Sequence, residues 1–352
     1  MKKKLNVLVT GIGGGGHGEQ IMKALKMSEK VQYNIIGADM SPFSMGLAKV
    51  SKKEILPAAT HPDYLQRLIE VCRKYDIKAL FHGSEPELKV MSNHRQQILD
   101  EDIFLPINPK SVIDLCMDKN KTAELLNHQG FQTLRYKNVQ SINDIETIDY
   151  FPVVLKPSIG GGGSASVMIA QSKNELEMFT TYLLNEYEEF IVQEYVGKPQ
   201  DEFTVGVLMD MDGQYINSIA MNRYILSSLS NRVKVKNRTA NKQLGDLLAI
   251  SSGISQGKIG KFEKITKPCA SLAKSIGAKG SINLQCRIWQ EQVYVFEINP
   301  RFSGTTSSRA MVGYNEPDIL IRKHIFGENI ITNFEYQEGT VLRGLEETLF
   351  IE

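Results

Sequence analysis

The sequence predicts an α/β domain followed by an α+β domain. At 352 residues, the chain is long enough for two to three domains of ordinary size. In its first part, apolar β-rich runs alternate with helical patterns, which is typical of a parallel sheet with helices on its faces. In its second part, short strands are joined by tight turns, which favours antiparallel hairpins. Pro106 and Pro109 place the change between the two patterns near residue 110.

The first part is expected to form one parallel sheet. A strand at 5–10 leads through a glycine-rich turn at 11–16 into an amphipathic helix. The next predicted elements are a strand at 33–38 that ends at Asp39, a helix at 63–74 and a third strand at 79–82. The turns after these strands should meet at the carboxyl edge of the sheet, where open α/β sheets bind their ligands.

The second part is expected to contain hairpins. Its predicted strands are 153–156, 190–193, 202–209, 215–221, 280–288 and 292–299. The dipeptides Asp212-Gly213 and Gln290-Glu291 are turn signals between two of these pairs. Such a succession predicts antiparallel sheets.

Composition excludes several classes of protein. The 41 basic side chains nearly cancel the 40 acidic ones, so no net field draws the chain to nucleic acid or to an anionic membrane. The four cysteines form no CxxC pair, which argues against a zinc cage or a disulfide framework. No apolar run approaches the length of a membrane span. We expect a cytoplasmic protein without a nucleic-acid or membrane partner.

The first glycine cluster carries one candidate function. Gly11, Gly13 and Gly16 have GxGxxG spacing, and Asp39 ends the next strand, where a dinucleotide-binding fold places its ribose acceptor. A turn that only packs the first helix against the sheet needs the same glycines. An NAD(P)-dependent oxidoreductase is therefore the main alternative function. None of the six histidines has ligand spacing, although His17 lies beside this turn.

A second glycine-rich loop follows a lysine. Lys156 ends an apolar strand, and residues 158–164 come directly after it. A flexible backbone loop beside a fixed cation suits a polyphosphate. The lysine precedes the glycines, so this segment is not a Walker A motif. A mobile hairpin turn is the other interpretation.

A third constellation consists of oxygen-bearing side chains on two neighbouring strands. Alternation places Glu297 and Asn299 on one face of their strand, with Phe296 on the other, and places Asn283 and Gln285 together. A hairpin loop with an odd number of residues, such as 290–292, would set Gln285 opposite Glu297. Mg²⁺ prefers such oxygen ligands and completes its shell with water and phosphate. The alternative is a polar strand facing solvent.

The run Phe296-Glu297-Ile298-Asn299-Pro300-Arg301 resembles the signature of the ATP-grasp ligases. Over nearly its whole length the chain is similar to a single ATP-grasp unit of the carbamoyl-phosphate synthase large subunit. The resemblance implies a Rossmann-like pre-ATP-grasp domain (1–110) and a two-lobed ATP-grasp fold. Its small lobe would carry the glycine-rich loop (111–190), and its large lobe the metal site and the C-terminal segment (191–352).

The resemblance also implies roles for individual residues. Lys119 and Lys156 would contact the ATP phosphates, beneath the loop of Gly160, Gly161, Gly162 and Gly163. Glu194, with the backbone of Tyr195 and Val196, would hold the adenine, and Glu202 the ribose hydroxyls. Gln285, Glu297 and Asn299 would bind Mg²⁺, or alternatively Mn²⁺. Arg301 would face the phosphoryl group that is transferred, and with Lys156 it forms the expected catalytic pair.

The implied activity is ADP-forming ligation, in which a carboxylate is converted to an acylphosphate and then attacked by an amine or similar nucleophile. The chain has length for one ATP-grasp unit, whereas carbamoyl-phosphate synthase uses two, so we do not expect carbamoyl phosphate as the product. The expected partners are a small carboxylate and its acceptor, and a homodimer is possible. A non-catalytic nucleotide-binding protein remains an alternative.

Residues 213–245 form the most biased segment of the chain. They include Arg223, Arg232 and Lys234 but no aspartate or glutamate. The two interpretations are a solvated surface loop and a lid that closes over anionic ligands, with Arg232 and Lys234 placed before a helix.

Overall fold

The first part of the chain forms a four-stranded parallel sheet in the order β3-β2-β1-β4. The structure is a computed structural model that describes residues 2–128, 131, 134–159 and 166–347. The strands are β1 (Lys3–Val9), β2 (Val31–Asp39), β3 (Lys52–Ile55) and β4 (Ala79–Phe81). The helical elements are α1 (His17–Lys26), η1 (Met45–Lys49), α2 (Tyr64–Lys74), α3 (Glu85–Asn93) and α4 (Arg95–Leu99).

The sequence prediction missed β3, so the strand predicted as the third is the fourth. The sequence of β3 is Lys-Lys-Glu-Ile, and its side chains are exposed or only partly buried. It pairs with β2 alone, at the edge of the sheet. Charged residues are typical of edge strands, and they leave no apolar pattern for sequence analysis to detect.

Two helices lead from the parallel sheet into the small lobe. They are α5 (Lys110–Cys116) and α6 (Lys119–His128). The small lobe is an antiparallel sheet in the order β5-β8-β6-β7, covered by α7. Its elements are β5 (Tyr136–Val139), η2 (Ile142–Ile145), β6 (Val153–Pro157), β7 (Met168–Ala170), α7 (Lys173–Glu186) and β8 (Phe190–Glu194).

The large lobe is built on a six-stranded antiparallel sheet in the order β15-β14-β9-β10-β13-β16. Its strands are β9 (Glu202–Met209), β10 (Tyr215–Arg223), β13 (Gly257–Gly260), β14 (Ser281–Trp289), β15 (Gln292–Asn299) and β16 (Gly339–Val341). Its helical elements are η4 (Pro199–Asp201), α8 (Glu263–Ser275), α9 (Thr306–Met311) and α10 (Glu316–His324). The predicted bounds of β9 and β15 are confirmed.

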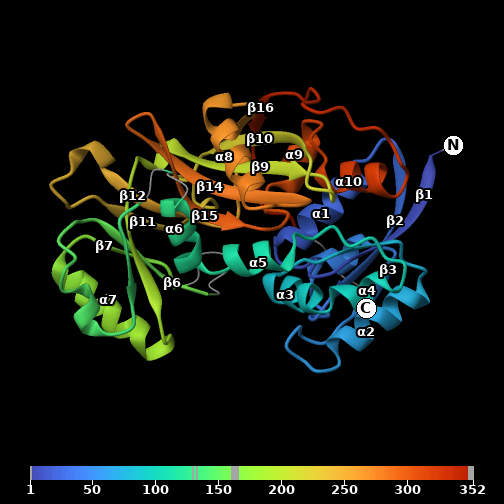
Figure 1. Cartoon of the computed structure of the whole chain (residues 1–352), viewed down its shortest axis with the longest axis horizontal. Coiled ribbons are helices and arrows are strands. Elements are labelled where there is room, and N and C mark those ends of the chain that lie inside the picture. Colours follow the sequence, from blue (N-terminus) through green and yellow to red (C-terminus); the bar gives the residue numbers. More distant parts are fainter. Residues whose placement is uncertain (1, 129–130, 132–133, 160–165, 348–352) are drawn as a thin grey trace.

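The two faces of the large sheet pack against different parts of the molecule. One face packs on α8 through a core that includes Val205, Leu272 and Leu284. The other face shares a core with the parallel sheet, in which Leu208 and Tyr314 join Val7. In Figure 1 the parallel-sheet domain, in blue, lies beside one end of the large sheet, and the small lobe, in green, lies beside the other.

The basic segment contains a β-hairpin, so the expectation of a loop before a helix is wrong. Its strands are β11 (Asn231–Lys236) and β12 (Leu247–Ser251), and the short η5 (Lys242–Leu244) lies between them. Arg232 and Lys234 alternate with Val233 and Val235, which pack with Trp289 in a small core. Charged and apolar residues alternate here with a period of two, which is a strand pattern. The sequence prediction considered only the number of cations in the segment and so missed it.

Candidate nucleotide and metal site

The hairpin of β14 and β15 pairs the predicted residues, but this register comes from a β-bulge and not from the predicted loop with an odd number of residues. Asn283 lies opposite Asn299 and Gln285 lies opposite Glu297, as expected. The turn, however, contains only Gln290 and Glu291 between the paired Trp289 and Gln292. Both turn residues have positive φ, at 48° and 62°, as in a type I′ turn. A β-bulge supplies the extra residue that the register needs.

The bulge residue is Phe296, which lies between the paired positions of Val295 and Glu297. It was expected to face away from Glu297, but it lines the same cavities as Glu297 because the bulge breaks the strict alternation. Its carbonyl accepts a hydrogen bond from Lys156 Nζ at 3.0 Å, and its ring centroid is 5.9 Å from that nitrogen. The bulge thereby joins the large lobe to the lysine of the small lobe.

A cavity with an excess of cations, called the cationic cavity here, lies where the two lobes and the parallel-sheet domain meet. Its charged lining residues are Glu85, Lys119, Lys156, Arg223, Glu297 and Arg301. Gln285 and Asn299 line it as well. The structure thus brings together all the predicted metal ligands and both predicted lysines. The glycines at 160–163 lie outside the described residues.

Lys156 is buried at the end of β6, where the strand pairs it with Ile191 of β8. The pKa of Lys156 is lowered to about 8, chiefly by burial, which the Glu297 carboxylate partly opposes and Lys119 reinforces. The ammonium group is therefore mostly protonated at neutral pH but has lost most of its hydration. An anion that enters the cavity would replace that hydration.

Arg301 is held by acceptors on both sides of the cavity. Its Nη2 donates to Asn299 Oδ1 at 2.8 Å and to Glu85 Oε1 at 2.9 Å, and its Nη1 donates to the carbonyl of Phe302. Its Nε is buried without a hydrogen-bond partner among the described residues. Glu85 begins α3 after the N-cap Ser84, so the pair joins the parallel-sheet domain to the large lobe.

The donor set of the hairpin fits a hard cation. Glu297 supplies one carboxylate, and Gln285 and Asn299 supply amide oxygens, which suit Mg²⁺. Asn299 Nδ2 donates to Glu297 Oε1 at 3.0 Å, which orients both side chains toward each other. Within the described ranges, no group of three His, Cys, Asp or Glu side chains is suited to a metal. A metal at this hairpin would therefore depend on the single charge of Glu297.

Asn283, the fourth member of the predicted polar patch, has its amide oxygen engaged. Asn283 Oδ1 accepts hydrogen bonds from Arg309 Nη2 at 2.6 Å and from Thr204 Oγ1 at 2.8 Å. Arg309 is fully buried and packs directly on Gly206, where a Cβ atom would lie only 2.3 Å from its Nη1. Asn283 thus lines the cationic cavity, but its amide oxygen is taken by the protein itself.

A second, more apolar cavity adjoins the first and shares Lys156, Gln285, Phe296 and Glu297 with it. We call it the apolar cavity. Its other lining residues include Leu134, Val154, Glu194, Tyr195, Val196, Glu202 and Ile250. The three predicted adenine contacts at 194–196 therefore lie together. The carboxylate of Glu194 is already paired with Arg135, at 2.8 Å.

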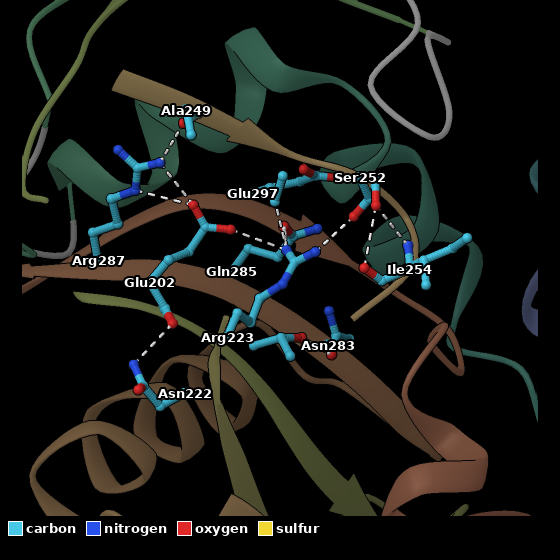
Figure 2. A network of polar contacts seen from close by, with 12 residues as sticks. Glu202, Asn222, Arg223, Ala249, Ser252, Ile254, Asn283, Gln285, Arg287 and Glu297 are labelled. Atoms are coloured by element: carbon cyan, nitrogen blue, oxygen red, sulfur yellow. Dashed lines mark hydrogen bonds and ion pairs between the residues drawn. The ribbon is translucent and has the colours of Figure 1, made fainter. Parts of the chain in front are cut away.

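Glu202, which lines the apolar cavity, lies between the two buried arginines Arg223 and Arg287 (Figure 2). Its Oε1 accepts from Arg223 Nη1 at 3.0 Å, and its Oε2 accepts from Arg287 Nε and Nη2 at 3.0 and 2.8 Å. Arg223 Nη1 also donates to Gln285 Oε1 at 3.1 Å. Both oxygens of the predicted ribose contact are therefore bonded to the protein itself.

Sequence reasoning missed the roles of both arginines. Arg287 continues the alternation of Asn283 and Gln285 along β14, so this signal was present. Arg223 was counted in the basic segment, but it is buried at the end of β10 rather than solvated. Its partners come from three other strands, β9, β12 and β14, and no local pattern indicates them.

Side chains of the protein itself occupy the space beside the N-terminal glycine turn. The Gly13 N–H donates to Asp39 Oδ2 at 2.9 Å, and the Ser41 N–H donates to Asp39 Oδ1. A Cβ atom at Gly13 would lie 2.3 Å from Ser44 Oγ. Asp39 thus closes the turn, which favours the packing interpretation over NAD binding.

His17, singled out in the sequence, lies beside His82, with 3.3 Å between His17 Nε2 and His82 Nδ1. Burial and the nearby Arg301 lower the pKa of both histidines, that of His82 to about 4. The pair is therefore neutral at physiological pH. It lies at the carboxyl edge of the parallel sheet, near Arg301.

Comparisons with known proteins agree with this architecture. Residues 7–105 match the family described as "PylC-like, N-terminal domain", and residues 247–347 match "ATP-grasp in the biosynthetic pathway with Ter operon". The chain thus has an ATP-grasp match in its C-terminal part and the ATP-grasp fold. The recognition made from the sequence is thus confirmed, as is the ATP-grasp fold.

Relatives by sequence are distant. The carbamoyl phosphate synthase large chain of Thermotoga petrophila is 22% identical over an aligned length of 281 residues, and the match covers 74% of this chain and 24% of that protein. The D-alanine–D-alanine ligase A of Bacillus cereus is 26% identical over 178 residues, 49% of this chain and 55% of that protein. The chain therefore spans about a quarter of the length of the synthase relatives.

Solved structures share the ATP-grasp fold over most of the chain. The L-amino acid ligase from Bacillus licheniformis superposes with a TM-score of 0.61 at 17% identity, covering 92% of this chain and 74% of that one. N5-carboxyaminoimidazole synthetase from Staphylococcus aureus, complexed with ADP, gives a TM-score of 0.63 at 16% identity, covering 96% and 81%. No helix in the described part of the chain has the length and apolar character to cross a membrane.

Proposed function

We propose that this ATP-grasp protein is an ADP-forming carboxylate ligase whose acceptor is an amine or a similar nucleophile. One observation carries the proposal: a cavity lined by Lys119, Lys156 and Arg301 meets the oxygen-bearing hairpin of Glu297 and opens into an apolar cavity. A molecule with a flat apolar base and a polyphosphate tail could place its base in the apolar cavity and its phosphates in the cationic cavity. The relatives named as ligases support the same class.

The apolar cavity is proposed to hold the adenine against Tyr195 and Val196, with Glu194 at its edge. The ribose would lie near Glu202. Because both Glu202 oxygens already accept from arginines, the carboxylate would contact a ribose hydroxyl only in addition to these bonds. We therefore expect Glu202 to maintain the wall of the site as well as to face the sugar.

The phosphates are proposed to lie in the cationic cavity. Lys119 and Lys156 would orient them. Gln285, Glu297 and Asn299 would hold Mg²⁺, which neutralises phosphate charge. Arg301, fixed by three acceptors, would offset the charge that develops on the transferred group.

The proposed reaction has two balanced steps. A carboxylate oxygen of the acid attacks the γ-phosphorus, and ADP leaves with the electrons of the broken P–O bond. The nucleophile then attacks the acyl carbon, phosphate leaves, and an amine nucleophile loses a proton. The protein provides position and charge and forms no covalent bond itself.

The test is a product assay with purified protein, Mg-ATP and a library of small acids and amines. ADP and phosphate should accumulate only when a suitable acid is present. Hydroxylamine should convert the acylphosphate to a hydroxamate that is detected by mass spectrometry. Formation of AMP and pyrophosphate instead would contradict the acylphosphate mechanism.

A further inference from the structure

The basic segment contains an edge strand whose cations lie outside the proposed ATP site. β11 pairs with β12 alone, so one of its edges has no neighbouring strand among the described residues. Val233 and Val235 pack inward in the small core, whereas the alternate side chains Arg232, Lys234 and Lys236 are exposed. None of these three cations lines the cationic cavity or the apolar cavity. The proposed function therefore gives them no role.

The hydrogen bonds of the backbone show which groups the free edge of β11 presents. Directly after β11, the Asn237 N–H donates to the carbonyl of Asp246 at 2.8 Å, so the backbone of residue 237 faces β12. In an antiparallel pair, the backbone groups of successive residues face the partner strand and the opposite side in turn. The N–H and C=O groups of Lys234 and Lys236 therefore point to the free edge.

One position on this edge is already occupied, by a side chain of the small lobe. Gln171, which follows β7, donates from Nε2 to the Lys236 carbonyl at 3.1 Å and accepts from the Arg238 N–H at 2.7 Å. Its amide thus satisfies two backbone groups that a neighbouring strand would otherwise bond. These groups face outward in a direction that hydrogen-bond partners reach, and the next open position along the edge is Lys234.

The side chains of the edge determine which kind of strand can add to it. Lysines on an edge strand oppose pairing with an apolar strand. An acidic strand would instead place carboxylates opposite Arg232, Lys234 and Lys236, and opposite charges on paired residues attract. Within the described residues these cations have no ion-pair partner, and Lys234 Nζ donates only to the Leu226 carbonyl, at 3.4 Å. The basic segment itself contains no acidic residue that would neutralise them.

We propose that the free edge of β11 binds an acidic, extended segment of a partner protein, which adds to the β11–β12 sheet as an antiparallel third strand. Main-chain hydrogen bonds at Lys234 would supply affinity, and the exposed cations would select acidic side chains. A nucleic acid would contact the cations but leave the backbone groups of the edge unpaired. The inference does not depend on the proposed ligase function, because β11 lines neither cavity.

The experiment measures the binding of fluorescent probes to the full chain by anisotropy. The main probe is a peptide in which glutamate alternates with threonine. A second peptide is N-methylated at its glutamates, which keeps the charge but removes the N–H groups that would face β11. A lysine–threonine peptide and a single-stranded RNA of the same length complete the set. Lys234→Glu is compared with Lys137→Glu, because Lys137 is also an exposed lysine on an edge strand, β5.

The acidic peptide should bind the wild type, and the lysine peptide should not. Methylation of the peptide and Lys234→Glu should each weaken binding about fivefold or more, the scale of one cross-strand pair or one hydrogen bond. Lys137→Glu should change the affinity less than about twofold, as for a charge that makes no contact. Residue-resolved hydrogen exchange should show that the acidic peptide slows exchange of the Lys234 N–H but not of the Val235 N–H, which faces β12.

Several results would overturn the proposal. Equal binding of the methylated peptide would show attraction by charge alone, without strand addition. Tighter binding of the RNA would make this edge a nucleic-acid surface. Absence of binding by the acidic peptide, or equal losses in Lys234→Glu and Lys137→Glu, would also contradict it. If Lys234→Glu does not fold, hydrogen exchange in the wild type decides, because unchanged exchange of the Lys234 N–H would exclude pairing at this edge.

Discussion

The two ends of the site handle charge in opposite ways. The two carboxylates that line the apolar cavity alone are bonded to arginine: Glu194 to Arg135, and Glu202 to both Arg223 and Arg287. In the cationic cavity, apart from the Arg223 that is bonded to Glu202, three cations (Lys119, Lys156 and Arg301) face the carboxylates of Glu85 and Glu297, and Lys156 donates to a backbone carbonyl. The first arrangement stabilises the wall of the site. The second leaves positive charge that an anionic ligand can neutralise.

We infer from this difference that the paired charges of the apolar cavity support the fold, whereas the cations of the cationic cavity serve to bind a ligand. A paired buried charge stabilises the structure only while both partners remain, so its loss should affect folding. An excess cation costs desolvation in the empty protein, so its loss should affect binding. The predictions below test that separation.

The largest effect is expected for Glu202→Gln. The substitution leaves two buried arginines without a counter-charge and should lower the free energy of unfolding by about 3–5 kcal/mol. Urea unfolding followed by circular dichroism measures it. The control is Glu194→Gln, which breaks the more exposed pair with Arg135 and should cost less than about 1 kcal/mol. If both variants lost the same free energy of unfolding, the buried pair would not be more important for stability than the exposed one.

Glu297→Ala should remove most Mg²⁺-dependent binding of ATP, because the hairpin then offers only neutral oxygens. We expect a loss larger than the 10–100-fold typical of losing an outer-shell metal partner. Calorimetric titration with and without Mg²⁺ measures it, and Glu297→Asp should retain part of the affinity. Unchanged Mg-ATP affinity in the alanine variant would remove the metal assignment.

Lys156→Met should weaken Mg-ATP binding about tenfold or more, the scale of a charged hydrogen bond. The methionine can still pack along the path of the lysine stem, and it removes a buried ammonium group. The midpoint of thermal unfolding should therefore be unchanged or slightly higher. A large fall in that midpoint would instead identify Lys156 as a residue that supports the fold.

The smallest effect is a pH dependence of Lys156, whose pKa in the folded protein is about 8. Above that pH the side chain loses its charge, and Mg-ATP affinity should fall by up to about tenfold per pH unit. The stability of the empty protein should change in the opposite direction. Between pH 8 and the unfolded value of about 10.4, the unfolded lysine binds more protons, so unfolding free energy rises with pH. Neither trend should appear in Lys156→Met.

The parts of this molecule that sequence predicted are those whose evidence is local. The alternating polar residues of β14 and β15 indicated the hairpin patch, and the alternation of strands and helices indicated the parallel sheet. The bulge at Phe296 was not predictable, because strict alternation assumes an undistorted strand. Arg223 was misread because its partners are distant in sequence. The sequence placed Glu85 only at the edge of the sheet. Its contact with Arg301 could not be predicted, because the two residues are far apart in the sequence and meet only in the folded chain.

The bulge at Phe296 also limits how the hairpin can be altered. The two-residue turn at Gln290 and Glu291 and the one-residue bulge together bring Gln285 opposite Glu297, because the register of a hairpin is set by its loop length. Insertion of one residue at the tip, or removal of the bulge, would shift this pairing and separate the side chains of the metal patch. A fluorescent label for sensing ligand binding should therefore be attached to one of the two exposed turn residues, so that the length of the turn is kept.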